Sequence, residues 1–172
     1  MKLYTSIRKV TLQKVTVCAL LFILSLVFFP YYTGGDQEVY REVYKSLADF
    51  DLLDGYIYYQ SKLSSKEIGH FFLAWLASPY VNQNIFIAIF NGLFAYATLS
   101  LFEKWGASLT ISVTIIFTNY YLLILYFPAE RLKFGFLFLA LSLINTNTKK
   151  FLMFFFLALI SHVQTVILYS SV

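Results

Sequence analysis

The amino-acid sequence predicts an all-α protein: a polytopic transmembrane bundle of about five spanning helices, with two short amphipathic surface helices in its first extracytoplasmic loop. Apolar residues make up 59% of the 172-residue chain and charged residues only 13%, against about 45–50% and about 25% in ordinary globular domains. The apolar residues gather in runs that approach the roughly 20 residues needed to cross about 30 Å of hydrocarbon. We therefore expect residues 1–172 to form a single membrane domain.

The first predicted span covers residues 15–32 and follows a tail, residues 1–14, with four basic and no acidic residues. A cleaved signal peptide begins in the same way. However, no small-residue cleavage site follows the run, which ends at Pro30, Tyr31 and Tyr32, and aromatic residues of this kind are typical of a membrane interface. We expect a retained helix whose amino terminus is cytoplasmic.

Residues 33–84 form the predicted extracytoplasmic loop, which carries seven acidic and four basic residues. Its first part has apolar residues at helical spacing after a Gly-Gly-Asp turn, so a surface helix should begin there with Asp36 as its cap. Its second part, residues 67–80, is apolar for only about ten residues, too few to span a bilayer. This segment is expected to lie on the outer leaflet or dip into it.

Four further spans are predicted at residues 85–102, 108–127, 131–145 and 151–170, none with an internal break. The connector before the last span contains two lysines, which favour the cytoplasmic side. Counting the spans backwards from there places the whole of residues 33–84 outside. The net charge of +4 comes from residues scattered at segment ends, so it indicates membrane sidedness and not a nucleic-acid partner.

The sequence contains no metal-ligand cluster and no redox motif, so we expect no cofactor and no metal. Its single cysteine, Cys18, lies in the first apolar run and is expected to pack as a small apolar residue.

Under this topology the unusual polar residues gather on the outer side of the membrane. His162 lies about twelve residues into a helix that starts inside, which places it about 18 Å up, in the outer half of the bilayer. Polar groups within a membrane are costly and usually face a bundle interior or a cavity, which favours a functional site. The candidates are Asp36, Glu67, His70, Glu130, Arg131, His162 and Gln164.

Each candidate also has a purely structural interpretation. Asp36 can be a helix cap alone, and Arg131 can extend to the lipid headgroups. His162 and Gln164 can hydrogen-bond to neighbouring helices. Glu67 and His70 can be ordinary interface residues, and this is the reading favoured for His70.

The candidates fall within a pattern that resembles a known family. The stretches GGDQEVYREVY, FPAERLKFGFLFLALSL and FFFLALISHVQTVIL look like the EpsG family of exopolysaccharide proteins, which is similar to the Wzy-type O-antigen and capsule polymerases. The family pattern is a G-x-D after the first helix, an arginine that opens a helix, and a histidine about thirty residues later. It maps onto Asp36, Arg131 and His162; where relatives often have serine two residues after the histidine, this chain has Gln164. Family members are longer, so the chain is expected to be an amino-terminal portion.

The resemblance implies polymerisation of polyprenyl-diphosphate-linked oligosaccharide units at the outer face of a bacterial cytoplasmic membrane. It assigns catalytic roles to Asp36 and His162. The partners implied are the lipid-linked saccharide, membrane lipids and other polysaccharide-assembly proteins. Two other classes of protein remain open: a saccharide-lipid transporter or flippase, and an inactive membrane subunit. The residues expected to bind substrate are Glu67, Glu130, Arg131 and Gln164.

Overall fold

The computed structural model describes residues 2–163 and residue 167. Within these residues the chain forms nine α-helices and a single 3-10 turn, and it contains no β-strand. The predicted all-α class is confirmed. The helices are α1 (Lys2–Phe28), α2 (Asp36–Leu47), α3 (Leu52–Leu63), α4 (Ile68–Ala77), α5 (Gln83–Lys104), α6 (Leu109–Thr118), α7 (Tyr120–Tyr126), α8 (Glu130–Ile144) and α9 (Thr148–Ser161), and the 3-10 turn is η1 (Phe29–Tyr31).

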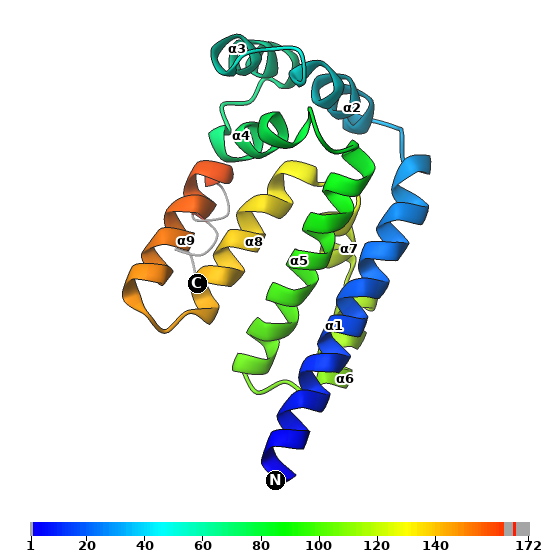
Figure 1. The fold of residues 1–172 in the computed structure, drawn as a ribbon, viewed down its shortest axis with the longest axis vertical. Helices are drawn as coiled ribbons and strands as arrows, with labels where there is room; N and C mark the ends of the chain where they lie inside the picture. Colours follow the sequence, from blue (N-terminus) through cyan, green and yellow to red (C-terminus); the bar gives the residue numbers. More distant parts are fainter. Residues whose placement is uncertain (1, 164–166, 168–172) are drawn as a thin grey trace.

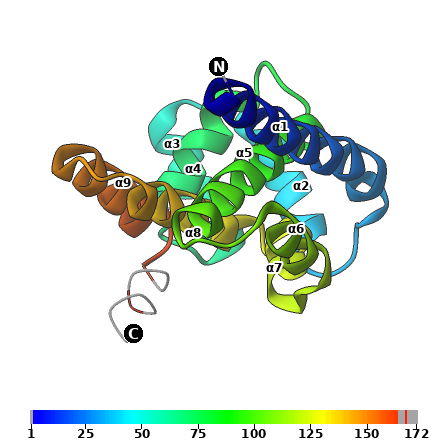
Figure 2. The ribbon, with the colours of Figure 1, turned by 90° about the horizontal axis from the view of Figure 1, so that it is seen from below.

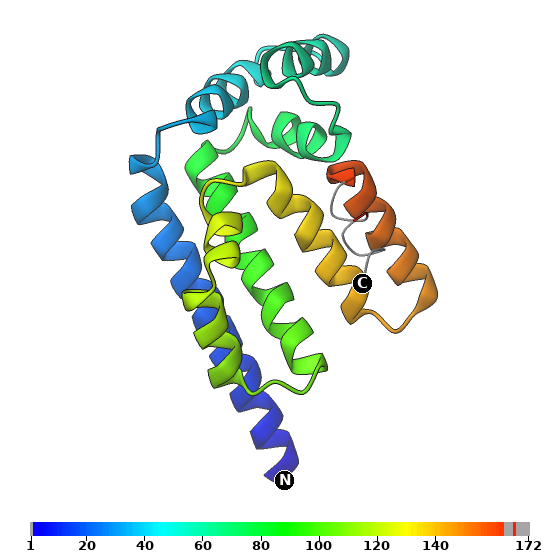
Figure 3. The same cartoon turned by 180° about the vertical axis from the view of Figure 1, so that it is seen from behind.

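The long helices stand in a row, and the short helices cover one end of it (Figure 1). Along the row α9 packs on α8, α8 on α5 and α5 on α1, as the view from below also shows (Figure 2). Helices α6 and α7 lie across one face of α1 and α5 (Figure 3). We call the end covered by α2, α3 and α4 the capped end. The turns that join α5 to α6 and α8 to α9 lie at the opposite end.

Two helices are long and apolar enough to cross a membrane: the part of α1 that continues into η1, over Thr11–Tyr31 (21 residues), and α5, over Gln83–Lys104 (22 residues). A third span is present if α6 and α7, which together pass the same test, are counted as one. Helices α8 and α9 have 15 and 14 residues, so each is only about 21–23 Å long. The described residues therefore contain two or three candidate spans, and five spans remain a prediction.

The segment predicted as one uninterrupted span at residues 108–127 is broken, and the expectation of a continuous helix was wrong. Helix α6 ends at Thr118, Asn119 has an extended backbone, and α7 leaves at an angle of 74°. The Asn119 side chain accepts a hydrogen bond from the Leu122 N–H at 3.1 Å. Asparagine favours such a break because its side chain replaces the backbone acceptor that a helix start lacks.

Helices α2 and α4 occupy the two predicted short segments, but the apolar stripe of α2 faces the protein. Tyr40, Val43, Tyr44 and Leu47 are at most 5% exposed, and most of them belong to a core cluster with side chains of α4, α5 and α8. This burial removes apolar area from water without a membrane. Contact of α2 with a membrane surface is therefore not needed to explain its pattern.

Two other details at the capped end differ from the sequence analysis. Helix α3 was not predicted; it begins after Asp51, whose carboxylate accepts hydrogen bonds from the N–H groups of Leu53 and Asp54 at 3.0 and 2.9 Å. Asp36 was predicted to cap α2 but is its first residue, and the capping position is occupied by Gly35. Gly35 has a φ of 65°, a backbone conformation that glycine adopts without steric cost.

Candidate functional site

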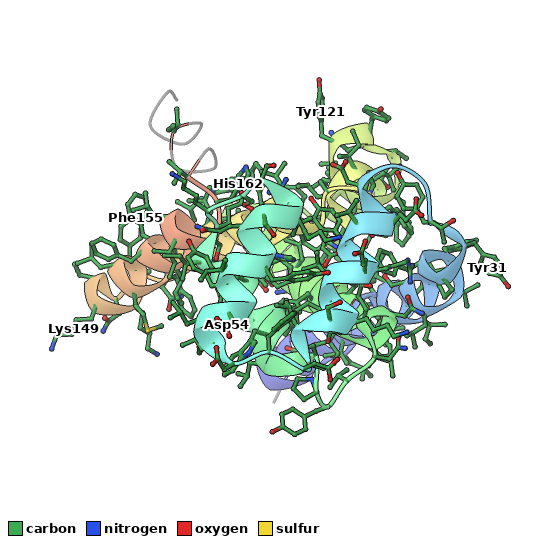
Figure 4. All side chains as sticks on the ribbon, turned by 90° about the horizontal axis from the view of Figure 1, so that it is seen from above. Tyr31, Asp54, Tyr121, Lys149, Phe155 and His162 are labelled. Atoms are coloured by element: carbon green, nitrogen blue, oxygen red, sulfur yellow. The ribbon has the colours of Figure 1, made fainter. Side chains whose placement is uncertain are left out.

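Three charged or titratable side chains from separate parts of the chain meet at the capped end. Glu67 directly precedes α4, Arg131 is in the first turn of α8, and His162 directly follows α9. His162 Nδ1 donates a hydrogen bond to Glu67 Oε1, and Arg131 Nη1 lies 3.4 Å from Glu67 Oε2. Figure 4 shows His162 beside the short helices, with Lys149 at the far end of α9. We call these three residues the Glu67 cluster.

A close approach of two helices holds the cluster together. Gly69 lies in the first turn of α4 against Ser161, the last residue of α9; a Cβ atom at position 69 would lie 2.8 Å from the Ser161 Cα atom. Only glycine permits this spacing. The helix predicted over residues 151–170 is instead interrupted: α9 ends at Ser161, His162 has an extended backbone with φ −166° and ψ 102°, and Val163 is helical again. His162 therefore lies at a break and not within the continuous helix that the sequence predicted.

The cluster opens onto a cleft of about 550 Å³ between α4, α8 and α9. The side chains of Glu67 and His162 are each 16% exposed, and that of Arg131 is 26% exposed. A small molecule could therefore reach all three. With Lys66 also on the rim, the cleft has two permanent cations against one carboxylate. The lining residues are Ser64, Ser65, Lys66, Glu67, Ile68, Arg131, Leu159, Ile160, His162 and Val163.

Glu67 is held in its ionised form. Burial alone would raise its pKa, but the hydrogen bond from His162 and the positive charges of Arg131 and His162 outweigh this effect and hold the pKa below its usual 4.5. Its Oε2 atom is buried and has no hydrogen-bond partner among the described residues. The 3.4 Å contact with Arg131 is thus an ion pair without an aligned hydrogen bond.

Arg131 is oriented from α2. Its Nε–H donates to the Tyr40 hydroxyl at 2.8 Å, and its guanidinium lies 5.6 Å from the centre of the Tyr40 ring. Asp36 lies one turn before Tyr40 on the same helix, is exposed, and does not line the cleft. The structure therefore brings Arg131 and His162 together through Glu67 and leaves Asp36 outside this group.

Glu130, which the sequence analysis expected to bind substrate, faces the protein interior. It is 1% exposed and does not line the cleft. Its Oε1 atom lies 3.3 Å from His70 Nε2, and its Oε2 atom accepts a hydrogen bond from Gln83 Nε2 at 3.3 Å. His70, 3% exposed, also lies 2.9 Å through Nδ1 from the Tyr59 hydroxyl. A buried carboxylate requires such partners.

Lys133 is a buried cation that the sequence analysis missed. It is 0% exposed, and its Nζ donates to the Tyr126 carbonyl at 3.1 Å. The charge of Glu130, one helical turn earlier, acts on it. The three-residue spacing of Glu130 and Lys133 within an apolar helix was the available signal, because residues at this spacing share a helix face. Gln164, another predicted site residue, lies outside the described residues.

The described part of the chain contains no group of three or more His, Cys, Asp or Glu side chains that could hold a metal ion. Comparison of the chain with protein-family models, with curated proteins and with solved structures yields no match. The function must therefore be argued from the site.

Proposed function

We propose that the protein transfers glycosyl groups between polyprenyl-diphosphate-linked saccharides, as in exopolysaccharide, O-antigen or capsule polymerisation. The observation that carries this proposal is the convergence of Glu67, Arg131 and His162 on one open cleft. The cleft combines a cation, an ionised carboxylate and an imidazole at the end of a membrane-type bundle. This set suits a substrate with a charged diphosphate and a reacting hydroxyl.

Arg131 is the proposed diphosphate ligand. Its guanidinium is always charged and presents several N–H donors in one plane, which match phosphate oxygens better than an ammonium group does. Tyr40 fixes its direction, and Lys66 adds a second positive charge at the rim. The acidic composition of residues 33–84 is therefore no obstacle, because the local charge of the cleft is positive.

Glu67 is the proposed partner of the acceptor hydroxyl. In the reaction this hydroxyl oxygen bonds to the anomeric carbon of the donor, the bond from that carbon to the diphosphate breaks, and polyprenyl diphosphate leaves. The Glu67 carboxylate lines the cleft and is the proposed acceptor of the hydroxyl hydrogen bond, while His162 holds it through Oε1. The proton that the hydroxyl loses must pass to a group that lines the cleft.

We place the capped end at the outer face of a bacterial cytoplasmic membrane. Lys104 is the last residue of α5, Lys149 and Lys150 are in the first turn of α9, and Lys14 pairs with Glu103 near the end of α5. These ends lie opposite the capped end (Figure 1), and lysine favours the cytoplasmic side. The exposed apolar side chains of α3 and α4 support contact of the capped end with lipid. A reporter that works only outside the cytoplasm, fused at Lys62, should be active, and one fused at Asn147 should be inactive.

The decisive test measures saccharide binding and transfer by the full chain in lipid nanodiscs. The probe is a synthetic polyprenyl-diphosphate-linked oligosaccharide, and the products are longer saccharides and free polyprenyl diphosphate. Arg131→Lys keeps the charge but loses the planar donors, so we expect at least about tenfold weaker binding. Lys62→Ala removes an exposed cation of the capped end outside the cleft and should bind as wild type does. Equal binding by wild type and Arg131→Lys would refute the proposal.

A transporter for the same lipid-linked saccharide is the second candidate, because α6 and α7 form an interrupted span and Lys133 is buried beside it. Broken spans and buried charges are common at transport sites. Movement of labelled substrate across a liposome membrane, without release of polyprenyl diphosphate, would favour this candidate over the first.

A further inference from the structure

A row of polar side chains leads from the cleft to the buried Glu130. Ser65 lines the cleft, is 7% exposed, and its hydroxyl accepts a hydrogen bond from the Glu67 N–H at 3.3 Å; it also acts on the Tyr59 phenol. The Tyr59 hydroxyl lies 2.9 Å from His70 Nδ1, and His70 Nε2 lies 3.3 Å from Glu130 Oε1. Each member thus adjoins the next, although they come from α3, α4, α8 and the loop between α3 and α4.

The hydrogen bonds of the row have one consistent direction. Glu130 can only accept when ionised, so His70 Nε2 carries the hydrogen and donates it. In a neutral imidazole Nδ1 is then the acceptor and takes the hydrogen bond of the Tyr59 hydroxyl. Burial, and then the charge of Glu67, raise the pKa of Tyr59, so its phenol stays protonated and remains a donor. Ser65 can donate to Tyr59 in turn.

We propose that Ser65, Tyr59, His70 and Glu130 form a path by which a proton leaves the cleft and is held on the buried Glu130 carboxylate. In one shift, Ser65 gives its hydroxyl proton to Tyr59, Tyr59 gives its own to His70 Nδ1, and His70 gives its Nε2 proton to Glu130. A hydroxyl bound in the cleft, or water, then reprotonates Ser65. One proton moves inwards, and only its source and Glu130 change charge.

Both carboxylate oxygens of Glu130 have polar neighbours, and aromatic rings surround His70. The fully buried Lys133 side chain comes from one turn further along α8, and Gln83 donates to the second carboxylate oxygen. Phe134 packs edge-on against the His70 ring at 5.0 Å. On the α2 side the centre of the Tyr40 ring lies 6.2 Å from that of the His70 ring, and the Tyr40 hydroxyl accepts the hydrogen bond from Arg131 Nε. Direct access of water to His70 is thus limited by aromatic rings.

Use of this path to accept the proton of a saccharide hydroxyl rests on the proposed function, but the path itself does not. It can be tested without substrate, because the chain has only two histidines. The full chain, labelled with ¹⁵N at histidine and held in lipid nanodiscs, gives two imidazole signals by NMR. A His162→Gln variant assigns the His70 signal. The measured quantity is the exchange rate of the His70 Nε2 hydrogen with water.

Tyr59→Phe and Ser65→Ala each remove one hydroxyl of the path and should slow this exchange at least about tenfold. Ser65→Thr restores a hydroxyl and should restore the rate. Tyr58→Phe and Ser61→Ala, which remove neighbouring hydroxyls on α3 that do not contact His70, should leave it unchanged. A second sample of each variant, labelled with ¹⁵N at tryptophan, verifies the fold through unshifted indole signals of Trp75 and Trp105.

Wild-type rates in a folded Tyr59→Phe or Ser65→Ala variant would overturn the path, as would an undetectable exchange of His70 in the wild type. This result is independent of the saccharide test. Loss of binding in Arg131→Lys together with unaltered exchange in Tyr59→Phe would leave the proposed function standing without the path. Normal binding by Arg131→Lys together with slowed exchange in Tyr59→Phe would leave the path standing without the proposed function.

Discussion

Gly69→Ala should separate α4 from α9 and open the Glu67 cluster. The added Cβ atom would lie 2.3 Å from Ser161 Oγ and 2.8 Å from Ser161 Cα. Rotation of the Ser161 side chain can relieve the first contact but not the second, which is to backbone. Because ordinary carbon contacts begin near 3.4 Å, the two helices must move apart by about 3.4 − 2.8 = 0.6 Å. Overpacking of this kind costs about 1–3 kcal/mol.

The matched control is Gly92→Ala in α5. A Cβ atom there would have its nearest contact at 3.6 Å, from the Cys18 carbonyl oxygen, so it fits without movement. Alanine should then be neutral or stabilising by about 0.5–1 kcal/mol in the helix. Thermal unfolding in nanodiscs and the His162 imidazole signal are the readouts. If Gly69→Ala is as stable as Gly92→Ala and leaves the His162 signal unshifted, the helix contact does not position the cluster.

Three further substitutions test individual interactions. Burial opposes the ionisation of Glu67, but its hydrogen bond and the neighbouring charges hold its pKa below 4.5. The ionised carboxylate therefore stabilises the fold above about pH 4.5. This stabilisation is lost as the pH falls through the lowered pKa. Glu67→Gln should therefore lower the melting temperature more at about pH 7 than at about pH 3; an equal loss at both would contradict this. Lys133→Met should cost about 1–3 kcal/mol in chemical unfolding because the Tyr126 carbonyl loses the hydrogen bond from Lys133 Nζ, and the double variant with Glu130→Gln should cost less than the sum of the two because the two side chains interact. Asn119→Ala should cost about 0.5–2 kcal/mol through loss of the α7 cap, whereas no change in stability would show that the break is held by packing alone.

The outline of the fold could be predicted because it depends on local composition. The apolar runs fixed the first span and α5, and the helical spacing of apolar residues after Gly35 located α2. The break at Asn119 could not be predicted with confidence, because an asparagine in an apolar run can also remain inside a helix. Helix α3 was missed, although Asp51 and Asp54 at its start are a typical capping pattern.

The sequence analysis identified the residues of the Glu67 cluster but not which of them contact one another. Arg131 and His162 were identified as polar residues placed where an apolar environment makes them costly. Their partner was assigned differently, since Asp36 was favoured while Glu67 lies between them. No sequence pattern pairs residues 95 positions apart.

The sequence by itself therefore determined the helical class, the helices that are long and apolar enough to cross a membrane, and the polar residues that interrupt the apolar runs. Only the tertiary structure decided that Glu67 joins Arg131 and His162, that Glu130 faces inwards to His70, and that a glycine contact sets their spacing. The physical reason is that composition and periodicity act over one or two helical turns. Which helix ends meet is set by the packing of whole helices against one another.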